Sequence, residues 1–247
     1  MPEGDTLHRI AERMRVLEGE VVEARSPHPR ADALGIAGRI DGRRLERVEA
    51  VGKHLLLTFE GDLVVRSHLR MRGRWRVQPA GRKLVGTPWL VLRGGAVEAI
   101  LWHGPVLTMG RDAVRRLGPD IMDEPPDLDA AVARLRAAPP GRQIGEALVD
   151  QRLVAGIGNI WRAEGLFLAG ISPFSRVGEL TDDGVRTVLA ETAQAMRARP
   201  GRRFVYRRTG LPCRLCGMPI RADRQGDAGR TVYWCPACQG GREPAGA

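Results

Sequence analysis

Residues 150–161 have the sequence DQRLVAGIGNIW, and within it Gly156 to Asn159 lie between two segments with helical periodicity. Asn159 is a suitable N-cap for the helix that follows it. Gly156 and Gly158 allow the backbone to approach a partner closely, and the first turn of a helix presents free N–H groups. The combination suits a phosphate group, although a Gly-Asn pair before a helix, taken alone, more often forms only a turn and a cap.

The chain around this segment divides into a strand-rich first half and a helical second half. Short strand-like segments separated by Gly, Pro or Asp are expected at residues 21–22, 45–51, 54–59, 63–65, 75–77, 89–92 and 97–101. Several short strands at this spacing are typical of an all-β sandwich or barrel. Helical periodicity is present at residues 1–17, 128–137, 144–150, 160–169 and 182–198. Asp5 or Thr6 can cap the first of these helices.

All four cysteines form two pairs, Cys213-x2-Cys216 and Cys235-x2-Cys238, with eighteen residues between them. Two such pairs supply the four thiolates of a closed tetrahedral zinc site, which is structural because it leaves no open coordination position. Two disulfides are the alternative. They are less favoured because the polar, acidic N-terminus does not resemble an export signal and no other cysteine is present. Zinc would fold a segment that is too short to have its own core.

The chain is strongly basic. Its 247 residues include 39 Lys plus Arg against 29 Asp plus Glu, a net charge of +10. Apolar residues make up 43%, enough for a core, so wholesale disorder is excluded. No run of about 18 apolar residues is present, which excludes a membrane helix. A polyanionic partner is expected, with nucleic acid favoured over a membrane surface.

The basic residues are concentrated in particular segments. Residues 66–76 contain five Arg, one His and no acid, with the basic side chains on every second position. On one strand they would share a face and repel one another, so phosphate contact is favoured over a merely solvated face. Residues 200–247 contain nine Arg against three acids, a net charge of +6. Only two lysines occur in the chain, Lys53 and Lys83.

Five segments resemble the formamidopyrimidine-DNA glycosylase and endonuclease VIII family. Residues 150–161 resemble its helix-two-turn-helix motif. Pro2-Glu3-Gly4 resembles its catalytic N-terminus, in the version typical of the endonuclease VIII branch, and residues 52–57 (GKHLLL) resemble the segment with its essential lysine. Residues 205–213 and 230–235 resemble its zinc finger. The resemblance spans essentially the whole chain.

This resemblance implies an α+β multidomain fold. The expected parts are an N-terminal β-sandwich with an N-terminal helix (1–124), a helical helix-two-turn-helix domain (125–209), a four-cysteine zinc finger (210–240) and a tail (241–247). It also implies one structural zinc ion, bound by Cys213, Cys216, Cys235 and Cys238. The implied partner is damaged double-stranded DNA.

The resemblance further implies a bifunctional DNA glycosylase/AP lyase that removes oxidised bases, mainly pyrimidines, and cleaves the strand by β,δ-elimination. Pro2, exposed by removal of Met1, would be the Schiff-base nucleophile, because a terminal amine with an ordinary pKa of about 8 keeps a neutral fraction. Glu3 would be the general acid/base. Lys53 would contact a phosphate and donate a proton. Arg230, expected on the finger's hairpin close to the metal, would clamp another phosphate.

Other residues are expected to hold and deform the DNA. Asn159 and the adjoining glycine backbone would bind a phosphate. The segment 69–75 resembles the family's void-filling loop, in which Met71 would insert into the space left by the flipped base. In that case Gly73 turns the chain and interrupts the single basic strand face. The further expected DNA contacts are Gly156, Gly158, Arg70, Arg72 and Tyr206.

Two features of this sequence depart from the family pattern and limit what the resemblance implies. Residues 102–107 lack the Arg and Phe that fill the void in the formamidopyrimidine branch, which argues against a preference for 8-oxoguanine opposite cytosine. Thr6 stands where many relatives have an acid. The alternatives are a glycosylase for oxidised purines and a catalytically inactive, zinc-dependent damaged-DNA-binding protein. We expect no membrane partner, a location in a bacterial-type cytoplasm on the nucleoid, and a monomer, which suffices for this chemistry.

Overall fold

The structure is a computed structural model that describes residues 2–104, 106–198, 201–240 and 244. The chain divides into two compact units between Arg116 and Leu117. The division lies before the expected boundary at 124/125, because the segment after Leu117 pairs with the helical half: Ile121 N–H donates to Ala155 O at 3.1 Å. Of the expected tail, residues 241–247, all but Pro244 lie outside the described residues.

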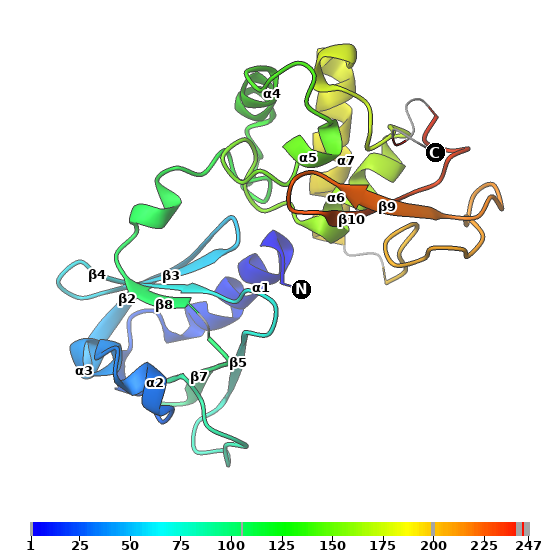
Figure 1. The fold of residues 1–247 in the computed structure, drawn as a ribbon. Coiled ribbons are helices and arrows are strands. Elements are labelled where there is room, and N and C mark those ends of the chain that lie inside the picture. The colour runs from blue at the N-terminus through cyan, green and yellow to red at the C-terminus, as the bar shows by residue number, and fades with distance from the viewer. Residues whose placement is uncertain (1, 105, 199–200, 241–243, 245–247) are drawn as a thin grey trace. The chain divides into compact units, whose positions relative to one another are not determined.

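An antiparallel sheet of eight strands forms the first unit (Figure 1). The strands are β1 (Val21–Arg25), β2 (Arg43–Val51), β3 (His54–Phe59), β4 (Leu63–His68), β5 (Arg74–Pro79), β6 (Leu90–Arg93), β7 (Val97–Trp102) and β8 (Val106–Met109). Their order is β5-β7-β6-β1-β2-β3-β4-β8. β1 belongs to both halves, because its first two residues pair with β2 and its last three with β6. Seven of these strands were expected from the sequence, and β8 was not.

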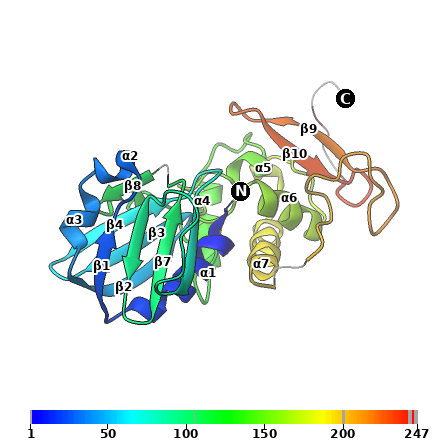
Figure 2. The ribbon, with the colours of Figure 1, turned by 90° about the horizontal axis from the view of Figure 1, so that it is seen from below.

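Both halves of the sheet face a single hydrophobic cluster, which makes the unit a β-sandwich (Figure 2). Leu57 of β3 and Leu101 of β7 lie in it, both fully buried. Helix α1 (Gly4–Met14) adds Leu7 and Met14, which lie seven residues apart on one face. A 3₁₀ turn (Arg15–Leu17) follows α1, and the remaining helical turns of the unit are α2 (Pro29–Asp32), α3 (Ile36–Ile40) and a 3₁₀ turn (Asp112–Val114).

Four α-helices build the first part of the second unit: α4 (Leu128–Arg136), α5 (Ile144–Ala147), α6 (Asn159–Leu168) and α7 (Asp182–Ala198), with a 3₁₀ turn (Val177–Glu179) before α7. All four helices contribute to one core, in which Leu135, Ile144, Trp161 and Leu189 are buried. The expected helices are thus confirmed, each within a few residues of its predicted ends.

The C-terminal part of the second unit contains a hairpin of β9 (Arg221–Gln225) and β10 (Arg230–Trp234) (Figures 1 and 2). It is not an independent module, because Ala163 and Phe167 of α6 share a hydrophobic cluster with Val205, Ile220 and the cysteine region. The predicted fold class, a β-sandwich followed by a helical part and a four-cysteine element, is confirmed. Among the described residues, no helix has both the length and the apolar character of a membrane span.

Candidate functional site

The N-terminal segment places Pro2 and Glu3 at the start of α1. The backbone carbonyl of Glu3 accepts hydrogen bonds from the N–H groups of Thr6 (2.9 Å) and Leu7 (3.2 Å), so Glu3 is the N-cap. The expected cap, Asp5 or Thr6, is therefore wrong, and Asp5 lies buried in the first turn. The side chain of Glu3 is 1% exposed, whereas Pro2 is half-buried. The two predicted catalytic residues thus stand on one rigid helix start.

Lys53 lies in the two-residue turn between β2 and β3, where Val51 pairs with His54 and Gly52 has a φ of 58°. Its neighbours include two imidazoles, His54 and His68, whose ring centroids are 4.9 Å apart. Burial lowers the pKa of both rings to about 4, and the positive charge of Lys53 contributes to both shifts. Two imidazoles that are neutral at physiological pH therefore lie near Lys53.

Two hydrogen bonds fix the orientation of these rings. Nη1 of Arg66 lies 3.1 Å from Nδ1 of His54, and the backbone N–H of Arg70 donates to Nδ1 of His68 at 3.1 Å. Because an arginine can only donate, His54 accepts at Nδ1 and keeps its proton on Nε2. The ring of His68 accepts at Nδ1 in the same way. Both imidazoles can therefore donate from Nε2.

The expected void-filling segment forms the turn between β4 and β5. Leu69 and Trp75 are buried, but Met71 is 63% exposed, which excludes a core role for it. Gly73 N–H donates to Leu69 O at 2.8 Å, and a Cβ at Gly73 would lie 2.6 Å from that same oxygen. Only glycine fits there, so the predicted turn at Gly73 is confirmed, and the basic residues 66–76 do not form one strand.

The start of α6 differs from the prediction in one detail. Gly158 is the N-cap and Asn159 is the first helical residue, so the side chain of Asn159 is not used as a cap. Its amide Nδ2 donates to Thr231 O at 2.8 Å, and its Oδ1 accepts from the guanidinium of Arg162. Asn159 therefore connects α6 with β10, next to Arg230.

The side chain of Gln151 holds the loop before α6 through hydrogen bonds to its backbone. Gly156 has a φ of 95°, and its N–H donates to Gln151 Oε1 at 3.1 Å. The Nε2 group of Gln151 donates to Ile157 O at 2.9 Å. A side chain of the same loop thus holds the Gly156 N–H, and the phosphate contact of the Gly156 backbone stays a prediction. Gly156 also contributes its left-handed conformation.

Arg230 is the first residue of β10, at the turn of the hairpin, where it pairs with Gln225. The predicted place on the hairpin is confirmed, but the predicted closeness to the metal site is wrong. The five-residue extended strand separates Arg230 from Cys235 by about 16 Å, at ~3.3 Å per residue. The side chain of Arg230 is exposed.

A buried guanidinium holds the turn of the hairpin. Arg162 is 1% exposed, and its Nη1 donates to Gln225 Oε1 (3.1 Å) and Gly145 O (3.2 Å). Its Nη2 donates to Thr231 O at 3.1 Å. Nε2 of Gln225 in turn donates to Pro173 O at 2.8 Å. Arg162 thus connects α5, α6, β9 and β10.

A second buried ionisable side chain, Glu164, anchors the segment before the cysteines. Its carboxylate accepts from the backbone N–H groups of Phe204, Val205 and Tyr206 at 2.8 to 3.0 Å. The ring of Tyr206 packs edge-on against Tyr233 of β10, with centroids 5.2 Å apart. Tyr206 is half-buried, with its backbone held by α6 and its ring by the hairpin.

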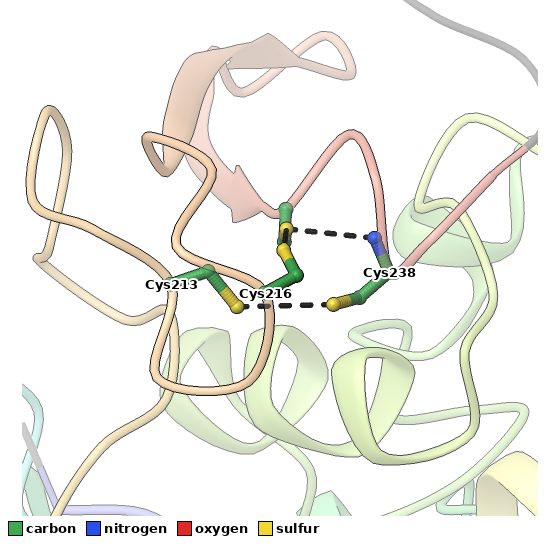
Figure 3. A group of neighbouring side chains, drawn as sticks. Cys213, Cys216 and Cys238 are labelled. Atoms are coloured by element: carbon green, nitrogen blue, oxygen red, sulfur yellow. Dashed lines mark hydrogen bonds between the residues drawn. The ribbon is translucent and has the colours of Figure 1, made fainter.

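The four cysteines come together as the sequence predicts, with all ligand atoms within 4.8 Å of one another (Figure 3). The Sγ atoms of Cys213 and Cys238 are 3.8 Å apart, and those of Cys216 and Cys235 are 3.4 Å apart. Both distances exclude a disulfide, whose sulfurs are about 2.05 Å apart. They suit a tetrahedral ion with metal–sulfur bonds of about 2.3 Å, which places its sulfurs about 3.8 Å apart.

The thiols of this group do not ionise together without a cation. Burial, followed by the neighbouring thiols, raises the pKa of Cys238 well above its ordinary value, and burial also raises the pKa of Cys235. Burial opposes ionisation of Cys213, but backbone N–H groups of Cys216 and Leu215 lower its pKa to about 7. Four thiolates would repel one another without a positive ion. The group can therefore bind a metal ion.

Comparison with known proteins gives the family. The model of the formamidopyrimidine-DNA glycosylase N-terminal domain matches residues 1–96, and that of the formamidopyrimidine-DNA glycosylase H2TH domain matches residues 117–199. A probable endonuclease 8 2 from Streptomyces coelicolor is 40% identical over an alignment of 270 residues that covers 99% of this chain and 96% of the relative. The chain belongs to the formamidopyrimidine-DNA glycosylase and endonuclease 8 family.

Other members of this family agree in length and fold. The DNA-(apurinic or apyrimidinic site) lyase Nei2 of Mycolicibacterium smegmatis is 37% identical over 97% of this chain and 99% of its own. A formamidopyrimidine-DNA glycosylase from Lactococcus lactis, crystallised with DNA that contains an oxidised pyrimidine, superposes with a TM-score of 0.81. It covers 97% of this chain and 100% of its own at 21% identity, which is a likeness of fold.

The buried residues that support the site were not predicted from the sequence. Arg162 and Glu164 lie in an otherwise largely apolar helix, and charged residues within such a helix are the signal that could have identified them as buried and bonded. Gln225 and Gln239 carried no such signal. Gln239 accepts from Cys235 N–H at 2.9 Å and donates to Ile171 O at 2.9 Å, so it fixes the cysteine end of the hairpin.

Proposed function

We propose that this protein is a bifunctional DNA glycosylase/AP lyase of base excision repair. The observation that carries the proposal is the position of Pro2 and Glu3 at the start of α1 in a chain that belongs to this enzyme family over its whole length. The substrate is damaged double-stranded DNA. The enzyme acts as a monomer in the cytoplasm, where bacterial DNA lies.

Removal of Met1 makes Pro2 the N-terminal residue. Its neutral secondary amine attacks the sugar C1′, a C1′–N bond to Pro2 forms, and the bond from C1′ to the base breaks. The base leaves with the electron pair and takes up a proton. The Pro2 nitrogen then loses its proton, and the C1′–O4′ bond of the sugar ring breaks with delivery of a proton to O4′, which leaves an iminium between C1′ and Pro2. The iminium acidifies the C2′ proton, and loss of that proton expels the 3′ phosphate. A second elimination expels the 5′ phosphate.

Glu3 is the acid/base partner in these steps. Because its backbone carbonyl receives the first hydrogen bonds of α1, its position relative to Pro2 is fixed by the helix start. Burial of its side chain keeps water from competing for protons. Lys53, Asn159 and Arg230 bind phosphates of the damaged strand, which position the DNA without reading its sequence.

Zinc is the ion that the four cysteines would hold, since four thiolates in tetrahedral arrangement are its typical structural ligand set. The ion would neutralise the thiolates and fix the fold of the cysteine region, with no part in the reaction. The residues that hold it are Cys213, Cys216, Cys235 and Cys238.

Oxidised pyrimidines are the proposed lesions, for two reasons. The relative from Streptomyces coelicolor, 40% identical over 99% of this chain, carries an endonuclease 8 name, and residues 102–107 have neither the Arg nor the Phe of the formamidopyrimidine branch. A duplex with 5-hydroxyuracil should therefore be cleaved faster than one with 8-oxoguanine. The reverse order would favour the purine-specific alternative.

Borohydride trapping tests the reaction. The protein, with removal of Met1 verified by mass spectrometry, is incubated with thymine-glycol or abasic duplex and sodium borohydride, and a stable covalent adduct is expected. Pro2→Gly keeps a terminal amine and should retain weak trapping, whereas a chain that keeps Met1 should give no adduct at Pro2. Cleavage without any adduct would overturn the Schiff-base mechanism. Tight binding to abasic DNA without cleavage would identify an inactive binding protein.

A further inference from the structure

We propose that a pocket on the first unit binds the base that is left unpaired opposite the lesion, and that it prefers guanine there. It is lined by the stacked rings of His28 and Trp89 and by the 70–72 turn. This inference rests on the proposed function, in which Met71 fills the space of the flipped base. In this proposal, the residues that line the pocket determine which base is preferred opposite the lesion.

The aromatic wall is flat and rigid. The rings of His28 and Trp89 are stacked with centroids 4.7 Å apart and an interplanar angle of 21°. Their backbones are held in place, because His28 N–H donates to Pro88 O at 3.0 Å and Trp89 N–H donates to Leu101 O at 2.7 Å. Unpaired bases stack on such rings irrespective of their sequence. The pocket of about 430 Å³ lies within the range of about 300–1,000 Å³ for small-molecule sites.

The turn that carries Met71 forms another part of the lining. Arg70 has a φ of 49°, and its N–H is bonded to His68, so the turn leaves β4 in a fixed direction. The close packing at Gly73 also sets this turn against His103, since a Cβ there would lie 3.0 Å from His103 O. Met71 and His103 both line the pocket. A base displaced from pairing by Met71 therefore has this pocket beside it.

Charge and hydrogen-bonding capacity define the base that fits. Among the residues that the structure describes, the pocket is lined by three arginines, Arg30, Arg70 and Arg72, and by no acid. His28 accepts the Arg30 N–H at Nδ1 (3.2 Å), so its Nε2 carries a proton and can only donate. A site that offers donors and no carboxylate suits the base edge with two adjacent acceptors. That edge belongs to guanine, whose O6 and N7 are the usual partners of arginine.

The test is a set of four duplexes, each with a tetrahydrofuran abasic analogue opposite G, A, C or T. Dissociation constants are measured at one salt concentration, because affinity for DNA depends on salt. Wild type should bind the duplex with guanine about 5-fold or more tighter than the others. Trp89→Ala should bind all four duplexes equally, and Trp89→Phe, which keeps a ring for stacking, should retain the preference.

Arg30→Gln keeps the aromatic wall and should reduce the preference for guanine at least about two-fold. Arg13→Gln, an exposed arginine on α1 outside the pocket, is the matched control and should change nothing. Equal binding of all four duplexes by wild type, together with tight binding of damaged over undamaged DNA, would overturn this inference alone. Failure to distinguish damaged from undamaged DNA would overturn the proposed function. If Trp89→Ala does not fold, an unchanged preference in Arg30→Gln overturns the inference.

Discussion

The side-chain amide of Asn159 donates a hydrogen bond to the backbone carbonyl of Thr231 at 2.8 Å. It joins the first residue of α6 to the residue that follows Arg230, across 72 positions of the chain. Two groups proposed to bind phosphate are thereby held on one rigid frame. Their spacing is set by the helix start and the hairpin together.

Asn159→Asp tests separately the structural role of this side chain and its proposed contact with a phosphate. The carboxylate still accepts from Arg162, so we expect the free energy of unfolding to change by less than about 1 kcal/mol. The donor to Thr231 is lost, however, and a negative charge now faces the phosphate. Affinity for abasic-analogue DNA should fall about 10-fold or more. Urea unfolding and equilibrium DNA binding check the two parts, and unchanged affinity would remove Asn159 from the phosphate site.

Arg162→Met tests the buried connection beneath the hairpin. The substitution leaves Gln225 Oε1 and Gly145 O without their charged donor in a buried site. We expect a loss of about 3 kcal/mol in the free energy of unfolding and a comparable weakening of DNA binding. Arg186→Gln is the control. It breaks an exposed pair with Asp129 and should cost less than about 1 kcal/mol. Equal losses in both variants would contradict a positioning role for Arg162.

Local sequence signals predicted most of the fold, and the misses have a common cause. The spacing of Leu7 and Met14, the two CxxC pairs and the Gly-Asn helix start are all local patterns, and each formed the expected element. The distance of Arg230 from Cys235 follows from the extended conformation of β10, which pairing with β9 fixes, and not from a separation of five residues alone. The roles of Arg162 and Gln225 likewise arise only when α6 and β9 meet.

Removal of the metal should act mainly on the cysteine end of the hairpin. Without a cation the four thiols cannot ionise together, and Ile220 and Val205 lose the frame that buries them. We expect chelation to lower DNA affinity about 10-fold or more while the first unit, with its separate core, unfolds at an unchanged temperature. Metal content and calorimetry on the same samples check this. Full affinity after complete metal loss would show that Arg162 and Asn159 hold Arg230 without the metal.

Stability should fall between pH 6.5 and about 4 because of the two imidazoles beside Lys53. Burial lowers the pKa of His54 and His68 to about 4 in the folded protein, with added repulsion from Lys53 and Arg66 on both and from Arg70 on His68. The unfolded chain binds these protons near pH 6.5, the folded chain only near pH 4, so acidification favours unfolding across this window. The double variant His54→Gln, His68→Gln removes both groups and should lose less stability between pH 7 and pH 5 than wild type in urea unfolding. An equal loss in the double variant would assign the acid sensitivity to other groups.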